Sequence, residues 1–272
     1  MSDVTPVLYE KRGKVALLTL NRPGIMNAMD QPMLVRMAEA LDEAEADEDV
    51  GAIVLTGAGK GFSSGFDLKA QAGSTPQGVH EWRPVLRRDF DTVMRFWSSP
   101  KPTIAAVHGP ALAGACELAM ACDVTICDET ATFGEPELKF GAGIVVMILP
   151  WIAGPKIAKE IILSGEDRLS AERAKEVGMV NRVVAAGQHL DEAIALANRM
   201  AAFEPDLVRQ TKRAINRAFE LMGMGEALEA ALDIDLLIEG EGTETKRQFL
   251  EIARKDGLRA AISWRDERLS KS

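Results

Sequence analysis

One glutamate stands alone in the most apolar stretch of the sequence. Residues 110–122 contain a single charged side chain, Glu117. Removing an isolated carboxylate from water is costly, so such a group is normally paired, protonated or used by a ligand. The residues before it are small enough to let a backbone or a ligand approach: Ala111, Ala113, Gly114 and Ala115. A protonatable group beside such a helix start suits chemistry through an enolate. The alternative is a glutamate at the wet edge of an otherwise buried helix.

Two strand–turn segments could direct backbone N–H groups at the same anion. An expected strand at 52–56 runs into a glycine-rich loop at 57–65, and an expected strand at 103–108 leads through small residues into a helix at 113–120. The positive end of that helix favours negative charge. One amide from each segment would form an oxyanion hole, which stabilises a developing enolate.

The glycine-rich loop matches neither common phosphate-binding pattern. Phe62 occupies the third glycine position of the dinucleotide fingerprint, and Gly61 follows Lys60 where a P-loop needs Ser or Thr. Its amides could still bind an anion, and a plain tight turn is the alternative.

Strands alternate with helices in the first part of the chain, which indicates an α/β core. Further strands are expected at 15–20 and 124–128, helices at 31–46 and up to about Trp97, and a polar surface loop at 71–80. Beyond about Val145 the pattern is helical apart from a strand at 181–184. We therefore expect an α/β core over 1–200 and a helical region over 201–272.

Composition excludes several classes of protein. The 272 residues carry a net charge of -9, whereas a nucleic-acid binder normally shows a basic footprint. No apolar run reaches the ~18 residues of a membrane span, and the N-terminus lacks the features of a secretory signal. Three cysteines in apolar sequence, Cys116, Cys122 and Cys127, indicate buried thiols in a reducing cytoplasm rather than disulfides or a zinc site.

Five ordered segments resemble the enoyl-CoA hydratase/isomerase (crotonase) superfamily, and together they span most of the chain. They are Leu20–Ala28, Gly61–Leu68, Ala105–Ala119, Phe133–Glu137, and Leu163–Ala171 running on to Gly178–Val183. The resemblance implies a spiral of ββα units, a C-terminal helical region used to form homotrimers or dimers of trimers, and an acyl-CoA thioester substrate. It implies no metal and no cofactor, since coenzyme A is part of the substrate.

The resemblance also assigns site residues by position. The oxyanion amides would be those of Phe66 and Gly114, and the two catalytic glutamates would be Glu117 and Glu137. Glu135 is the competing assignment for the second glutamate. Contacts to coenzyme A would come from Ile25, Met26, Ser64, Asp67, Leu68 and Lys69.

Two carboxylates suit the hydration of a 2-enoyl-CoA. Water must be activated for attack on C3 while a proton is delivered to C2, and negative charge collects meanwhile on the thioester oxygen. Two neighbouring carboxylates titrate as a coupled pair, so one can stay protonated near neutral pH. The sequence leaves open which glutamate is the acid.

Two departures from the family pattern concern the acyl group. Phe66 stands where simple hydratases commonly carry alanine, and bulky residues follow Gly143 at 144–151 in place of a glycine-rich turn. We therefore expect the usual thioester chemistry on an unusual acyl group. The alternatives are a double-bond isomerase of the same superfamily, which is the nearest rival, and another acyl-CoA enzyme of the superfamily that forms rings, decarboxylates or hydrolyses. A non-catalytic RNA-binding or scaffold relative is disfavoured by the presence of the glutamates and the acidic charge.

Overall fold

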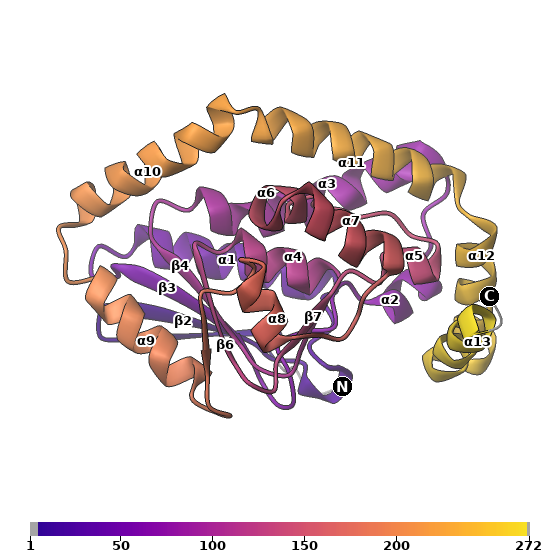
Figure 1. Cartoon of the computed structure of the whole chain (residues 1–272), viewed down its shortest axis with the longest axis horizontal. Coiled ribbons are helices and arrows are strands. Elements are labelled where there is room, and N and C mark those ends of the chain that lie inside the picture. Colours follow the sequence, from indigo (N-terminus) through magenta and orange to yellow (C-terminus); the bar gives the residue numbers. More distant parts are fainter. Residues whose placement is uncertain (1–4, 271–272) are drawn as a thin grey trace.

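A six-stranded sheet forms the centre of the computed structural model, which describes residues 5–270 (Figure 1). The first pair of strands is antiparallel and every later pair is parallel. In spatial order the strands are β1 (Val7–Arg12), β2 (Val15–Leu20), β3 (Ala52–Gly57), β4 (Thr103–Val107), β6 (Val124–Asp128) and β9 (Arg182–Val184). The mixed α/β fold expected from the sequence is confirmed.

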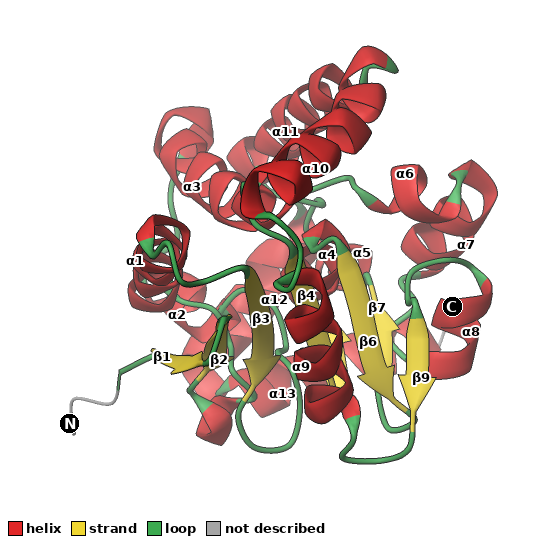
Figure 2. Cartoon of the chain, turned by 90° about the vertical axis from the view of Figure 1, so that its left-hand side faces the viewer, coloured by secondary structure: helices red, strands yellow, loops and turns green. Residues whose placement is uncertain are grey.

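Helices cover both faces of this sheet, as Figure 2 shows. On one face α9 (His189–Met200) packs against β3, β4 and β6. On the other face lie α1 (Gln31–Ala46) and α4 (Gly114–Ala121), with α3 (Gly78–Ser98) packed on both of them. Every residue of β3 is buried, as expected for a parallel strand between two helical layers. The strands and helices expected in these regions agree with the structure to within one residue at the ends compared.

A second, smaller sheet positions the catalytic candidates. Its strands are β5 (Pro110–Leu112), β7 (Thr132–Gly134) and β8 (Leu169–Ser170), in that order. The chain leaves β5 into α4, and it leaves β7 toward α5 (Glu137–Phe140). These strands were not expected from the sequence, because two or three residues are too few to show an alternating pattern.

The expectation of a surface loop at 71–80 is wrong in part. The helix α2 (Leu68–Gly73) includes its first residues, and α3 begins at Gly78. Asp67 caps α2, since its Oδ1 accepts two backbone N–H groups of the first turn at 3.0 Å each. A six-residue helix with one buried side chain has no apolar stripe that a sequence pattern could reveal.

The C-terminal helices fold back onto the same chain. They are α10 (Pro205–Leu221), α11 (Met224–Glu241), α12 (Glu244–Asp256) and α13 (Leu258–Ser270). The helix α11 packs on α3, and α12 packs on α2, so that the chain end curls around one side of the molecule (Figure 1). A domain boundary near residue 200 stays a prediction.

Short elements complete the fold between the sheets and the C-terminal helices. They are η1 (Pro23–Ile25), α6 (Leu149–Ala153), α7 (Pro155–Ser164) and α8 (Ala171–Glu176). Within residues 5–270, no helix combines the length and the apolar character needed to cross a bilayer.

The buried side chain of Asn27 joins the first loop of the core to the glycine-rich loop. Its amide nitrogen lies 2.9–3.0 Å from the carbonyl oxygens of Ala58, Gly61 and Phe62. Its Oδ1 accepts the backbone N–H of Arg22 at 2.9 Å. Asn27 itself has a φ of +50°, a conformation that asparagine tolerates better than most residues. The shape of the glycine-rich loop therefore depends on this one amide.

We expect Asn27→Ala to lower the free energy of unfolding by about 2–4 kcal/mol, because buried carbonyl groups would lose their donor. Urea denaturation followed by circular dichroism measures the change. Asn21→Ala is the control, since the Asn21 amide makes one surface hydrogen bond, to the Thr5 carbonyl at 3.1 Å. Equal losses in the two variants would contradict this role of Asn27.

Candidate active site

Glu117 is buried in the first turn of α4, with 1% of its surface exposed. The backbone N–H of Val146 donates to its Oε1 at 3.1 Å. Its Oε2 has no partner among the residues that the structure describes. The wet-edge alternative is therefore wrong: Glu117 is a buried carboxyl with one oxygen free to bind another group.

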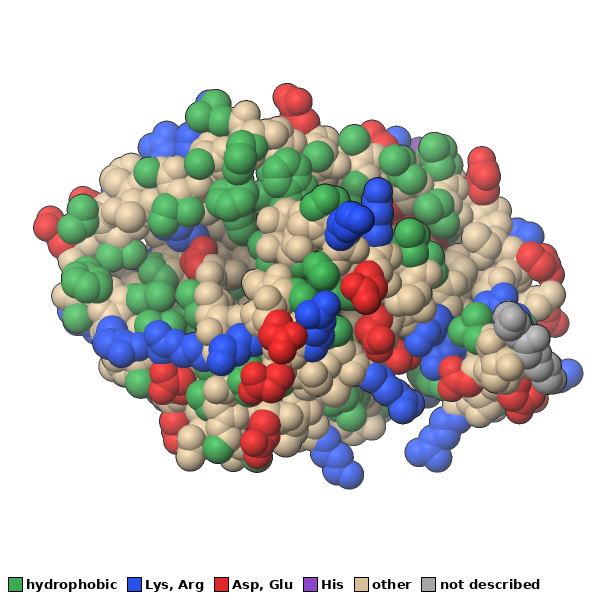
Figure 3. Space-filling model, in the orientation of Figure 1, with side chains coloured by type: hydrophobic (Ala, Val, Ile, Leu, Met, Phe, Trp, Pro, Cys, Tyr) green, Lys and Arg blue, Asp and Glu red, His purple; other side chains and the backbone are tan. Residues whose placement is uncertain are grey.

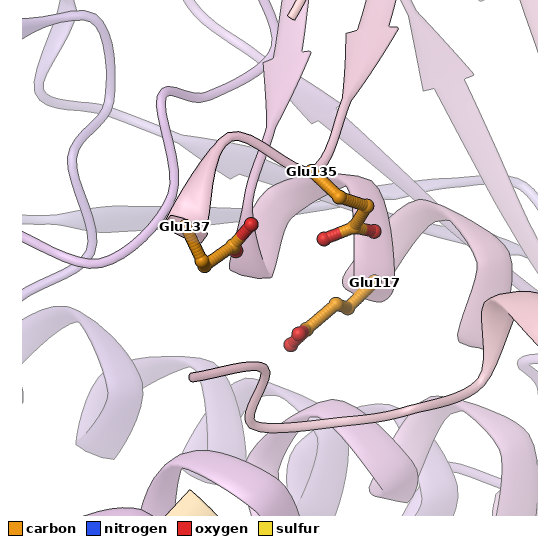
Figure 4. A group of neighbouring side chains, drawn as sticks. All are labelled: Glu117, Glu135 and Glu137. Carbon is orange, nitrogen blue, oxygen red and sulfur yellow. The ribbon is translucent and has the colours of Figure 1, made fainter. Parts of the chain in front are cut away.

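Two further glutamates face Glu117: Glu135 from the turn after β7 and Glu137 from the start of α5. Glu135 is 1% exposed and Glu137 is 9% exposed. One carboxylate oxygen from each of the three glutamates lies within 4.8 Å of the others, and Figure 4 shows the side chains pointing toward one another. A single water making two hydrogen bonds of about 2.8 Å spans such a separation. The structure therefore brings Glu117 and Glu137 together, and it adds Glu135 as a third member.

Burial raises the pKa of all three carboxyls. The pKa of Glu137 rises from 4.5 to about 8, mainly through loss of hydration. The pKa values of Glu117 and Glu135 rise well above the ordinary range, first through burial and then through the neighbouring charge of Glu137. Near neutral pH the group therefore holds protons and still has a member that can ionise, which is the requirement for acid–base chemistry.

The same three oxygens have the spacing of ligands to a hard cation. A cation would need these carboxylates ionised, whereas the raised pKa values favour protonated forms near neutral pH. Without a bound cation, the three carboxyls are therefore protonated groups suited to proton transfer, and a cation would have to displace these protons to bind.

Two unpaired backbone amides lie where the expected oxyanion hole should be. Within residues 5–270, neither the N–H of Phe66 nor that of Gly114 has a hydrogen-bond acceptor. The two segments are in contact, because a Cβ added to Gly65 would lie 3.3 Å from the nitrogen of Gly114. Ala113, which begins the turn into α4, has a φ of +55° that is uncommon for alanine. Such strain is typical of functional turns.

The ring of Phe66 lies directly over Gly114. A β-carbon at position 114 would collide with Cε2 of this ring, so only glycine fits there. The ring also lines the adjoining cavity. That Phe66 reshapes the mouth of the pocket stays a prediction.

A cavity of about 380 Å³ adjoins these groups. Glu137 and Phe66 line it, whereas Glu117 is not one of its lining residues. Of the residues expected to contact coenzyme A, five line this cavity: Ile25, Ser64, Asp67, Leu68 and Lys69. Met26 does not, because its sulfur is directed toward Gly61. The side chain of Asp67 already caps α2 and pairs with Arg22 at 3.1 Å.

A second acidic group lies in the same cavity and was not expected from the sequence. Asp235 and Glu239 of α11 and Asp89 of α3 line the cavity together with Lys246 of α12. Asp235 and Glu239 lie on the buried face of α11 with Leu228, Leu232 and Leu236. Acidic residues that fall on an apolar stripe, three residues after Leu232 and Leu236, are the signal that could have revealed them.

The sequence and the fold are similar to those of one protein family. The sequence profile described as enoyl-CoA hydratase/isomerase matches residues 10–251. An enoyl-CoA hydratase/isomerase from Xanthobacter autotrophicus Py2 is 64% identical, with 97% of this chain and 98% of that chain covered and a TM-score of 0.95. A short-chain-enoyl-CoA hydratase of Clostridium acetobutylicum is 34% identical over 97% of both chains. A mitochondrial enoyl-CoA hydratase of Pongo abelii is 34% identical, over 90% of this chain and 85% of that one.

The buried glutamates should make stability fall as pH rises. The unfolded chain releases these protons near pH 4.5, whereas folded Glu137 keeps its proton up to about pH 8. The folded state therefore binds more protons across this window, and its stability declines with pH. Because glutamine stays neutral, the stability of Glu135→Gln should not fall with pH in this way. We therefore expect its Tm relative to that of the wild type to rise by at least about 2–4 °C between pH 5 and pH 9.

Thermal unfolding across this pH range measures the gain. Glu160→Gln, at an exposed site on α7, is the control and should follow the wild type at every pH. A constant difference between Glu135→Gln and the wild type would contradict the raised pKa of Glu135.

Proposed function

Because the chain belongs to the enoyl-CoA hydratase/isomerase family, we propose that it catalyses the reversible addition of water across the 2,3 double bond of an acyl-CoA thioester. The observation that carries this proposal is the pair formed by Glu117 and Glu137, whose oxygens are separated by the span of one water. The unpaired amides of Phe66 and Gly114 supply the second requirement of the reaction.

In the proposed mechanism the two glutamates hold the attacking water. One carboxylate accepts a proton from the water as its oxygen attacks C3, and the other carboxyl delivers a proton to C2. The result is a 3-hydroxyacyl thioester. The catalytic pair returns to its starting state when the proton gained by the base passes to the spent acid. Glu135 lies close enough to exchange protons with the pair.

The negative charge of the enolate develops on the thioester oxygen. The amides of Phe66 and Gly114 would bind this oxygen, and Gly114 stands at the positive end of α4. Two unpaired N–H groups form stronger hydrogen bonds with the enolate oxygen than with the oxygen of the neutral ester, so they lower the activation barrier. This chemistry is complete with protein groups and the coenzyme A ester, and we propose that no further cofactor takes part.

The reaction requires both glutamates, whereas a double-bond isomerase can work with one proton shuttle. We expect Glu117→Gln and Glu137→Gln each to lower the kcat for hydration of crotonyl-CoA by about 10²–10⁴-fold. The dissociation constant for the ester should change little. Loss of absorbance of the conjugated thioester gives the rate, and isothermal titration calorimetry gives the affinity.

Two controls accompany these variants. Glu160→Gln should retain full turnover, and Glu135→Gln decides between the two assignments of the second glutamate. Full activity in Glu137→Gln with loss in Glu135→Gln would transfer the role to Glu135. Tight ester binding without turnover of any conjugated ester by the wild type would favour the isomerase.

We also propose that the chain assembles with copies of itself as a trimer or a dimer of trimers, in the cytoplasm. The helix α10 buries none of its residues in the single chain although it is strongly amphipathic. Apolar side chains gather over α10 and α11 in Figure 3, and exposed ones include Leu207, Ile215, Leu221, Ile234 and Leu237. An uncovered apolar surface of this kind is typical of an interface. Three free buried cysteines support a reducing compartment.

Charge on α10 should break this assembly. We expect the wild type to sediment at three or six times its chain mass of 29.5 kDa, and Ile215→Asp to shift it toward the single chain. Val35→Asp, at an exposed position on α1, is the control and should leave the mass unchanged. A single-chain mass for the wild type would contradict the proposal.

A further inference from the structure

Asp235 is a buried carboxyl that the protein leaves without a partner. It is 2% exposed, it lines the cavity, and neither of its oxygens has a hydrogen-bond partner within residues 5–270. Burying a carboxyl without a hydrogen-bond partner costs free energy, so such a group normally binds a partner that comes from outside the chain. Burial and the nearby charge of Glu239 raise its pKa to about 7.

The charged neighbours of Asp235 are already engaged with one another. Lys246 forms an ion pair with Glu239, which also accepts the N–H of Gly143 at 3.3 Å. Asp89, on the facing helix α3, accepts hydrogen bonds from Arg88 at 3.0 and 3.2 Å. Among the residues that the structure describes, Asp235 is thus a carboxyl in the cavity lining that none of these neighbouring cations pairs with through a hydrogen bond.

The glycine at position 143 makes room for this carboxylate. A β-carbon there would collide with Oδ1 of Asp235. Gly143 does not have a positive φ, so the backbone conformation itself does not demand glycine. The close approach of Asp235 therefore explains why position 143 is a glycine.

Asp235 lies close to the reacting end of the substrate. It touches the position of Gly143, and three residues later Val146 donates to Glu117. Three peptide units extend at most about 11 Å between Cα atoms. The charge of Asp235 also raises the pKa values of Glu117 and Glu137, as a near neighbour would. An acyl chain that extends from C3 toward Gly143 is therefore expected to approach Asp235.

We propose that Asp235 binds a hydrogen-bond donor, a hydroxyl or an ammonium group, at the far end of a short acyl chain. The inference rests on the proposed function for the identity of the thioester. A hydroxyl satisfies the carboxyl in either protonation state, since it can donate to the ionised form and accept from the protonated one. An unsubstituted acyl chain would leave Asp235 unpaired, and a terminal carboxylate would meet uncompensated negative charge.

Saturated esters test this binding directly because they cannot be hydrated. Calorimetry with the wild type compares hexanoyl-CoA with 6-hydroxyhexanoyl-CoA, 6-aminohexanoyl-CoA and 5-carboxypentanoyl-CoA. We expect the hydroxy or the amino ester to bind about tenfold to a hundredfold more tightly than hexanoyl-CoA, the effect of a hydrogen bond to a charged group. The carboxy ester should bind most weakly. The tighter of the hydroxy and amino esters identifies the donor.

Variants at position 235 assign the preference to this side chain. Asp235→Leu should reverse it in favour of hexanoyl-CoA, and Asp235→Asn should reduce the preference for a donor. Asp233→Asn, at an exposed site on the same helix, should keep it.

Several results would overturn the proposal. The wild type could bind hexanoyl-CoA as tightly as the hydroxy and amino esters, or it could bind the carboxy ester most tightly. Asp235→Leu could also keep the wild-type preference for a donor. Because these esters do not react, a failure here leaves the hydration of crotonyl-CoA as a separate test of the function.

Discussion

Carboxyl groups buried with too few cations are the constraint on which the site depends. Glu117, Glu135 and Glu137 lie close together and are buried, and the charge of Glu137 raises the cost of ionising the other two. Only protonation, a bridging water or a substrate can relieve that cost, and the same shortage of partners lets a proton move within the group. Unpaired carboxyls are a poor way to stabilise a fold, so their retention argues for use in catalysis.

Two loops and two sheets hold this arrangement together. The small sheet places the start of α4 beside the end of β7, which brings Glu117 to the other two glutamates. The glycine-rich loop is fixed by Asn27 and packs against the turn before α4. The two amides of the proposed oxyanion hole thus come from segments about fifty residues apart in the sequence but adjacent in space.

The C-terminal helices, proposed above as a surface for assembly, also contribute to the cavity. Asp235 and Glu239 of α11, Lys246 of α12 and Arg265 of α13 all line the cavity next to Glu137. The sequence analysis treated this region as a separate helical unit, because its periodicity indicates helices but not what they face. Part of the cavity lining is therefore built from the part of the chain in which the sequence showed no chemistry.

The sequence by itself determined the mixed α/β core, the isolation of Glu117 among apolar residues, and the family motif that points to Glu137. These features depend on local pattern, since a charge in an apolar run or a strand beside a glycine loop is visible in a few residues. Only the tertiary structure decided that Glu135 joins the pair, that Phe66 covers Gly114, and that Asp235 approaches Gly143. The last two are contacts between segments far apart in the chain, and the arrangement around Glu135 needs the small sheet. Their energies depend on burial and distance, which local sequence does not encode.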